Sequence, residues 1–184
     1  GVYLANSKNA LRIEGQQTVS FEIAQDLDWR APDWIVLPSG NLGNVSAIVR
    51  GFERLCAAGI CDRVPRVLAA QSDRADPFFR AFQNGFAHKQ TVVAGETQAT
   101  AIRIGDPVSF SRAVRAMRAC EGVVESICER DLADVARTAD FCGLYVCPQT
   151  AIALAATKRA IASGLISKKQ TIVVVSTAHG LKFQ

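Results

Sequence analysis

The chain has 184 residues, of which 49% are hydrophobic and 21% are charged, and its formal net charge is +4. This balance is typical of a globular protein and excludes an intrinsically disordered chain. Acidic and basic residues are interleaved without a block of like charges, which disfavours a nucleic-acid partner but is compatible with a small anionic ligand. The apolar runs are far shorter than the ~18 residues of a membrane-spanning helix, so we expect no membrane partner.

Short apolar, β-branched runs alternate along the chain with segments of helical periodicity. In chain order, we expect a strand at 2–5, a helix at 14–27, a strand at 33–37, a helix at 44–58, a strand at 65–70, a long loop at 84–100, a helix at 107–119, a strand at 123–127, helices at 129–141 and 148–163, and a strand at 171–176. Pro107 and Pro148 fit the first turns of their helices, and Gly164 fits a helix end. The alternation predicts an α/β fold with a mainly parallel, twisted sheet and flanking helices.

The six cysteines form no C-x-x-C pair, and the chain offers only two histidines, His88 and His179, to complete a zinc site. We therefore expect no metal. Several cysteines lie in apolar runs and no signal peptide is visible, which favours reduced, buried thiols and a reducing compartment.

The stretch PSGNLGN, residues 38–44, lies between a predicted strand and a predicted helix. Ligands of open parallel sheets bind beyond the carboxyl ends of the strands, which is where this loop lies. Gly40 and Gly43 permit positive φ and close approach, so that successive N–H groups can surround an anion, and Asn44 is a good N-cap for the helix. The loop predicts a phosphate site, although an ordinary strand-to-helix turn has a similar composition. The chain lacks G-x-G-x-x-G and G-x-x-x-x-G-K-[ST], which disfavours NAD dehydrogenases and P-loop proteins.

Three further stretches are informative as motifs: NSKNALRIEG at 6–15, ATAIRIGDPVS at 99–109 and STAHGLK at 176–182. Together with PSGNLGN, and in this order, they resemble the threonine synthase family, above all its plant-type branch. The resemblance implies a tryptophan-synthase-β-like, fold-type II enzyme that uses pyridoxal 5'-phosphate, with residues 1–184 forming part of its large, cofactor-binding domain. It also implies a homodimer in the cytoplasm, or in the plastid stroma if the source is a plant or an alga.

The resemblance assigns roles to individual residues. The cofactor phosphate would be held by Ser39, Gly40, Asn41, Leu42, Gly43 and Asn44, and the pyridine nitrogen by the Thr177 hydroxyl. The phosphate of the substrate, O-phosphohomoserine, would be held by Asn6, Ser7 and Arg12, with Asn41 nearby. These residue types suit the roles, because a guanidinium forms bidentate hydrogen bonds to phosphate oxygens, and short polar side chains add further hydrogen bonds.

The Schiff-base lysine of the family has no match, because none of the chain's lysines lies in the expected sequence context. We therefore expect the chain to be the C-terminal portion of a threonine synthase, inactive by itself. The full enzyme would convert O-phospho-L-homoserine and water to L-threonine and phosphate. Two alternatives stay open: another fold-type II enzyme, such as a threonine dehydratase or a cysteine synthase, and a catalytically dead, synthase-derived binding module.

Overall fold

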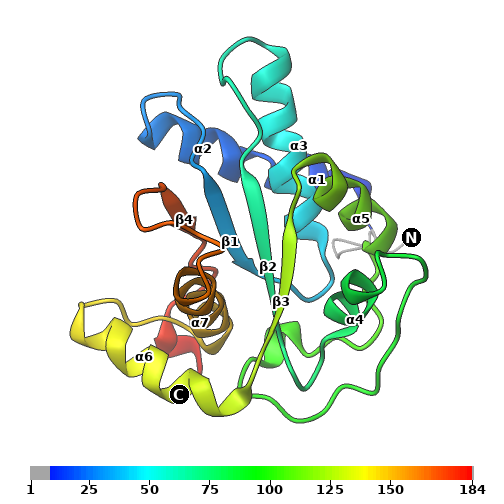
Figure 1. Ribbon diagram of the computed structural model, residues 1–184, viewed down its shortest axis with the longest axis vertical. Helices are drawn as coiled ribbons and strands as arrows, with labels where there is room; N and C mark the ends of the chain where they lie inside the picture. The colour runs from blue at the N-terminus through cyan, green and yellow to red at the C-terminus, as the bar shows by residue number, and fades with distance from the viewer. Residues whose placement is uncertain (1–8, 184) are drawn as a thin grey trace, which may run out of the picture.

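Four strands form one sheet in the order β3-β2-β1-β4, and every neighbouring pair is parallel (Figure 1). The computed structural model describes residues 9–183. Its strands are β1 (Trp34–Pro38), β2 (Arg66–Ser72), β3 (Val123–Ile127) and β4 (Ile172–Val174). The predicted parallel sheet is confirmed, and the strand expected at 2–5 lies outside the described residues.

Helices cover both faces of the sheet (Figure 1). Those associated with one face are α1 (Ala10–Gln16), α2 (Thr18–Asp26), α3 (Gly43–Ala57), α4 (Pro77–Gln83) and α5 (Phe110–Ala119), and those on the other are α6 (Leu132–Phe141) and α7 (Pro148–Ala162). Short 3-10 turns are η1 (Thr100–Ile102), η2 (Glu129–Asp131) and η3 (Gly180–Phe183). Pro148 begins α7 as predicted, and the backbone leaves the helix through Gly164 at φ +78°.

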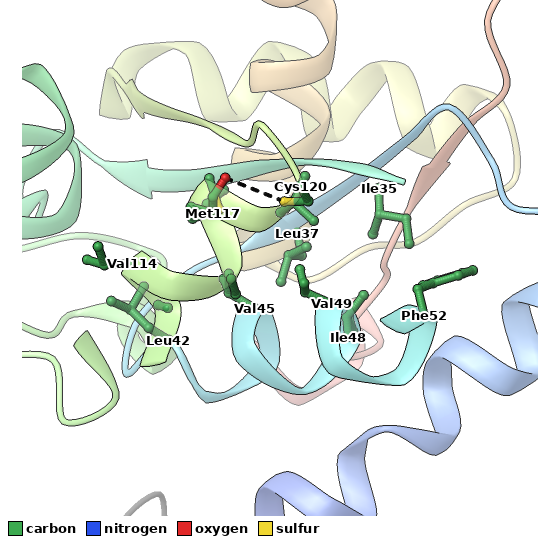
Figure 2. Packing of buried hydrophobic residues seen from close by; sticks show 14 of the residues in the cluster. Ile35, Leu37, Leu42, Val45, Ile48, Val49, Phe52, Val114, Met117 and Cys120 are labelled. Carbon is green, nitrogen blue, oxygen red and sulfur yellow. Dashed lines mark hydrogen bonds between the residues drawn. The ribbon is translucent and has the colours of Figure 1, made fainter. Parts of the chain in front are cut away.

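The central strand β1 is buried along its whole length because helices pack on both of its sides. Ile35 and Leu37 belong to the core under α3 and α5, whereas Trp34 and Val36 belong to the core under α7. Figure 2 shows the first of these cores, with side chains of α3 and α5 gathered against the sheet. A continuous apolar run is therefore the signature of this strand, as expected for a parallel sheet covered on both faces.

Three helix predictions were wrong at their N-terminal ends. The helix expected over 129–141 starts as the 3-10 turn η2, and α6 begins only at Leu132. The helix expected over 14–27 is two helices that meet at the buried Gln17. The helix expected from 107 begins at Phe110, because the residues before it are tied to the 38–44 loop: Ser109 N–H donates to the Asn41 carbonyl (3.1 Å) and Val108 N–H to Asn41 Oδ1 (3.4 Å).

Helix α4 was not predicted from the sequence. Pro77 begins the helix, and the buried Gln71 of β2 accepts the N–H groups of Phe78 (2.9 Å) and Phe79 (3.0 Å) at its side-chain oxygen. Gln71 also donates to the Ser39 carbonyl at 3.0 Å. The helix start therefore depends on an acceptor from the sheet rather than on an N-cap of its own sequence, and the same side chain links it to the 38–44 loop.

All six cysteines have free thiols, and Cys142 at the end of α6 is exposed, contrary to the expectation that the thiols are buried. Among residues 9–183, no helix is long and apolar enough to cross a membrane, and no cluster of three or more His, Cys, Asp or Glu side chains could hold a metal ion.

Candidate functional site

A cavity of about 680 Å³ opens beyond the carboxyl ends of β1 and β4. Its walls come from α1 and α2, from the 38–44 loop and α3, from η1, from the start of α7 and from the segment after β4. The lining residues are Arg12, Ile13, Gln16, Val19, Pro38, Gly40, Asn41, Leu42, Gly43, Asn44, Ile48, Ala101, Ile102, Gln149, Val175, Ser176, Thr177, Ala178 and Phe183.

The cavity lies where the winding of the sheet reverses. After β1 the chain adds β2 and β3 on one side, and it then crosses to add β4 on the other side of β1. The helix that follows β1 and the helix that precedes β4 lie on opposite faces (Figure 1). A crevice at such a switch point is the usual ligand site of an open α/β sheet.

The 38–44 loop is held in shape by its own polar groups. Asn44 Nδ2 donates to the Pro38 carbonyl (2.7 Å), and Asn44 Oδ1 accepts the Val45 N–H (2.9 Å). Ser39 N–H donates to the Ala70 carbonyl (2.8 Å) and its hydroxyl to the Leu37 carbonyl (3.2 Å). Ser39 therefore braces the loop against the sheet and, alone among the six predicted loop residues, does not line the cavity.

The conformation of the loop differs from the one expected. Neither Gly40 nor Gly43 has a positive φ; the left-handed residue is Leu42, at φ +66° and ψ +11°, and it is also the N-cap position that the sequence assigned to Asn44. Leu42 is 1% exposed and belongs to the core with Val114, which holds it in this conformation (Figure 2). The left-handed region costs an ordinary residue roughly 1–2 kcal/mol, so burial of the leucine side chain offsets a local strain.

Gly40 is required for a different reason, which is close packing. A Cβ atom at this position would lie 3.0 Å from Ile102 Cα and 3.2 Å from a side-chain carbon of Ile104. At Gly43 the nearest atom would be the end of the Ile13 side chain, at 3.3 Å. The loop thus passes directly against the 102–104 segment, a contact that was not predicted from the sequence.

The electrostatics of the cavity favour an anion. Helices α3 and α7, of 15 residues each, both present their N-terminal turns to the cavity, through Gly43 and Asn44 and through Gln149. Free N–H groups and the positive ends of the helix dipoles attract negative charge there. Arg12 adds a full positive charge, and the lining residues in the described part of the chain include no carboxylate.

Arg12 on α1 is exposed and forms no ion pair with any residue in 9–183. Its neighbour Glu14 is instead paired with Arg50 (3.0 Å) and Arg54 (2.8 Å) of α3. A hydrogen bond from Gln17, aided by the two arginines, lowers the pKa of the Glu14 carboxyl. Glu14 therefore anchors α1 on α3, which leaves Arg12 to face the cavity.

A small network at the start of α7 holds the segment after β4. Cys147, fully buried, is the N-cap, and its Sγ accepts the Thr150 N–H (3.4 Å) and lies 3.1 Å from the Thr150 hydroxyl. Thr177 donates its N–H to the Thr150 hydroxyl (3.2 Å), and its own hydroxyl lies 3.7 Å from Cys147 Sγ. Burial alone would raise the pKa of the Cys147 thiol, but the hydrogen bonds, led by that of Thr150, lower it. Neither Cys147 nor Thr150 was predicted as a site residue, and the only signal for them in the sequence is the Cys-Pro pair at the helix start.

The structure brings most of the predicted site residues to one cavity. Arg12, the loop from Gly40 to Asn44 and Thr177 all line it, although they come from three distant parts of the chain. Asn6 and Ser7 lie outside the described residues. Gln149, which the sequence analysis did not single out, is buried in the lining.

The chain is similar to known proteins in both sequence and fold. A family model described as "Pyridoxal-phosphate dependent enzyme" matches residues 1–178. The chain is 45% identical over 183 residues to Threonine synthase 2, chloroplastic, of Arabidopsis thaliana, covering 99% of the chain and 36% of that protein. It is 37% identical over 182 residues to threonine synthase of Methanocaldococcus jannaschii, covering 98% of the chain and 45% of that protein. The chain thus spans less than half the length of either relative.

Among solved structures, a fungal L-serine ammonia-lyase from Rhizomucor miehei superposes with a TM-score of 0.80 at 22% identity, covering 97% of this chain and 55% of that one. At this identity the likeness concerns the fold alone. Together with the family match, it confirms the predicted class of fold-type II pyridoxal-phosphate enzymes.

Proposed function

Because the chain belongs to the family of pyridoxal-phosphate-dependent enzymes, we propose that it is part of a threonine synthase. The full-length enzyme would be a lyase that converts O-phospho-L-homoserine and water to L-threonine and phosphate. The observation that supports this proposal most is the cavity, which combines Arg12 with two helix N-termini and no carboxylate from the described residues. Both the cofactor and this substrate carry a phosphate, and the cavity offers positive groups from more than one side.

The residues present fit pyridoxal phosphate. The volume of about 680 Å³ lies within the usual range for small-molecule sites. Apolar side chains such as Ile48, Ile102 and Val175 can enclose a ring, and the 40–44 loop at the start of α3 can hold a phosphate. The buried Gln149 amide, which has no partner in 9–183, indicates that a polar ligand belongs there.

Each group of residues then has a separate task. The N–H groups of the 40–44 loop bind the cofactor phosphate, and the Thr177 hydroxyl, restrained through Thr150 and Cys147, donates to the pyridine nitrogen. Such a donor keeps the ring neutral, whereas a carboxylate partner would favour its protonation. When bound, the cofactor supplies the electron sink for removal of the substrate's α-proton. Arg12 binds the substrate phosphate, which is the leaving group, through bidentate, charge-assisted hydrogen bonds and thereby orients it.

The proposal is tested on the full-length protein that contains this chain. Supplied with O-phosphohomoserine and pyridoxal phosphate, it should release threonine and inorganic phosphate in equal amounts. Formation of a keto acid from threonine, with phosphohomoserine untouched, would identify a threonine dehydratase. Sulfide-dependent cysteine formation would identify a cysteine synthase, and failure to bind the cofactor would identify a binding module.

For the full-length protein we also propose a homodimer, to be checked by sedimentation. The proposed location is the cytoplasm, or the plastid stroma in a plant or an alga. The name of the Arabidopsis relative, which marks it as chloroplastic, supports the second location if the source is photosynthetic.

A further inference from the structure

Gln149 is a buried polar side chain in the wall of the cavity. It occupies the second position of α7 and is 2% exposed, and it lines the cavity. Neither its side-chain oxygen nor its side-chain nitrogen has a hydrogen-bond partner within the described part of the chain. A buried amide without partners is costly, and native proteins keep such groups rarely and usually for a ligand or a bound water.

Gln149 lies next to the residues that hold Thr177, on one side of the cavity. The residues on either side of the Pro148–Gln149 pair, Cys147 and Thr150, are the ones that hold Thr177. Arg12, in contrast, comes from α1, which packs on α3 across the sheet from α7 (Figure 1). Gln149 is therefore associated with the proposed ring-binding side of the cavity, and Arg12 with the proposed substrate-phosphate side.

We infer that the Gln149 carboxamide binds the polar edge of pyridoxal phosphate, an inference that rests on the proposed function. The amide offers two N–H donors and one carbonyl acceptor, so it can satisfy an oxygen or a ring nitrogen in either protonation state. It stands at the N-terminus of α7, where the helix dipole strengthens binding of a negatively charged oxygen. The amide adds a contact from α7 to those that the 40–44 loop and Thr177 make from the other walls.

The experiment compares Gln149→Met with wild type in the full-length protein. Methionine has a similar shape but lacks the donors and the acceptor. We expect the variant without cofactor to melt at the same or a higher temperature than wild type, because an unpaired buried amide is removed. The dissociation constant for pyridoxal phosphate, followed by cofactor absorbance and protein fluorescence, should rise about five- to tenfold. The matched control, Gln83→Met, changes an exposed glutamine at the end of α4 and should alter neither value.

A second variant, Gln149→Glu, keeps the size of the side chain and adds a negative charge. It should bind the anionic cofactor at least as weakly as Gln149→Met does. With cofactor at saturation, the KM for O-phosphohomoserine should stay unchanged in both variants, because the substrate phosphate is assigned to Arg12.

The outcomes separate the inference from the proposed function. Wild-type protein that binds no pyridoxal phosphate would refute both. Wild-type protein that binds it, with unchanged affinity in Gln149→Met and Gln149→Glu, would overturn the inference alone. A lower melting temperature with unchanged affinity would show that the amide pairs within the protein, and a raised KM with unchanged cofactor affinity would assign it to the substrate. Either result would also overturn the inference.

Discussion

At the residue scale, the surroundings of Arg12 and Cys120 determine their roles: Arg12 lines the cavity, whereas Cys120 lies in the apolar core. Arg12 lines the cavity without an ion pair in the described chain, whereas Arg50 and Arg54 on the adjacent helix are paired with Glu14. An unpaired guanidinium at a ligand cavity is available for an anion. Cys120 lies in the apolar core, where its thiol is a structural group.

Replacing Arg12 with alanine in the full-length enzyme should weaken use of O-phosphohomoserine, measured as kcat/KM, by roughly ten- to a hundredfold or more. Arg12→Lys should recover only part of this loss, because an ammonium group lacks the planar fork. The absorbance spectrum of the bound cofactor should not change. Arg115→Ala, at an exposed arginine of α5, is the control. Unchanged kinetics in Arg12→Ala, or loss of the cofactor, would contradict the assignment.

The Cys120 thiol should make the stability of the fold sensitive to alkaline pH. Burial raises the pKa of this thiol to about 11 from an ordinary value of 9.0. A raised folded-state pKa contributes stability that is complete below about pH 9 and is lost as the pH rises towards 11, because the unfolded chain ionises first. The loss should reach about 2–3 kcal/mol in the free energy of unfolding.

Denaturant titrations at a series of pH values test this dependence. The alkaline loss in the free energy of unfolding should be smaller in Cys120→Ala, which is less stable than wild type but whose stability depends less on pH. Cys142→Ala, at an exposed thiol, should follow wild type. Parallel curves for wild type and Cys120→Ala would show that the buried thiol does not ionise on unfolding.

At the element scale, the connection from β1 to α3 is shaped by what packs against it. Leu42 takes the left-handed conformation, Gly40 touches the 102–104 segment, and Asn41 binds the residues before α5. The loop is therefore clamped between the sheet and a segment some 60 residues later in the chain. A clamped loop presents its N–H groups in a fixed arrangement, which a phosphate site requires.

Gly40→Ala should damage the loop although the substitution adds only one carbon atom. The new Cβ would lie 3.0 Å from a backbone atom of Ile102, so one of the two segments must shift. We expect a lower melting temperature and an at least tenfold weaker affinity for pyridoxal phosphate in the full-length protein.

Gly15→Ala is the matched control, because nothing lies within 4 Å of a Cβ at that helical position. Its stability should be equal to wild type or up to about 1 kcal/mol higher. Normal cofactor affinity in Gly40→Ala would show that the phosphate does not depend on this loop.

At the scale of the whole molecule, the site is assembled by the winding of the sheet. The parallel order β3-β2-β1-β4 brings the segments after β1 and β4 together at one edge. The helices packed on opposite faces, α3 and α7, both present their N-terminal turns to the cavity at this edge. The topology as well as single residues therefore favours an anion at this edge.

The chain expressed by itself should not hold the cofactor covalently. No lysine among the described residues lines the cavity, and the lysines at 89, 158, 168, 169 and 182 all lie elsewhere. Borohydride treatment in the presence of pyridoxal phosphate, followed by mass spectrometry of the peptides, should therefore label no single lysine selectively. Selective labelling of one of them would show that this chain contains its own nucleophile for the cofactor.

The parallel α/β architecture could be predicted from the sequence, and a phosphate-binding loop at 38–44 is a prediction of the same kind, because both depend on local patterns. Runs such as 33–37 are apolar enough to be buried on both faces, and Gly, Asn and Ser after a strand favour a turn with free N–H groups. The short motifs also indicated Arg12 and Thr177, whose proposed roles remain predictions. Contacts between distant segments could not be read from the chain.

Three features became evident only in the folded structure: Leu42 rather than a glycine is left-handed, α4 begins on Gln71, and Gln149 is buried without a hydrogen-bond partner among residues 9–183. Each of these features depends on a group that lies elsewhere in the fold: the core around Leu42, a strand side chain, and the space at the reversal of the sheet. Local propensity is weak compared with such packing, so the elements were predictable while the details of the site were not.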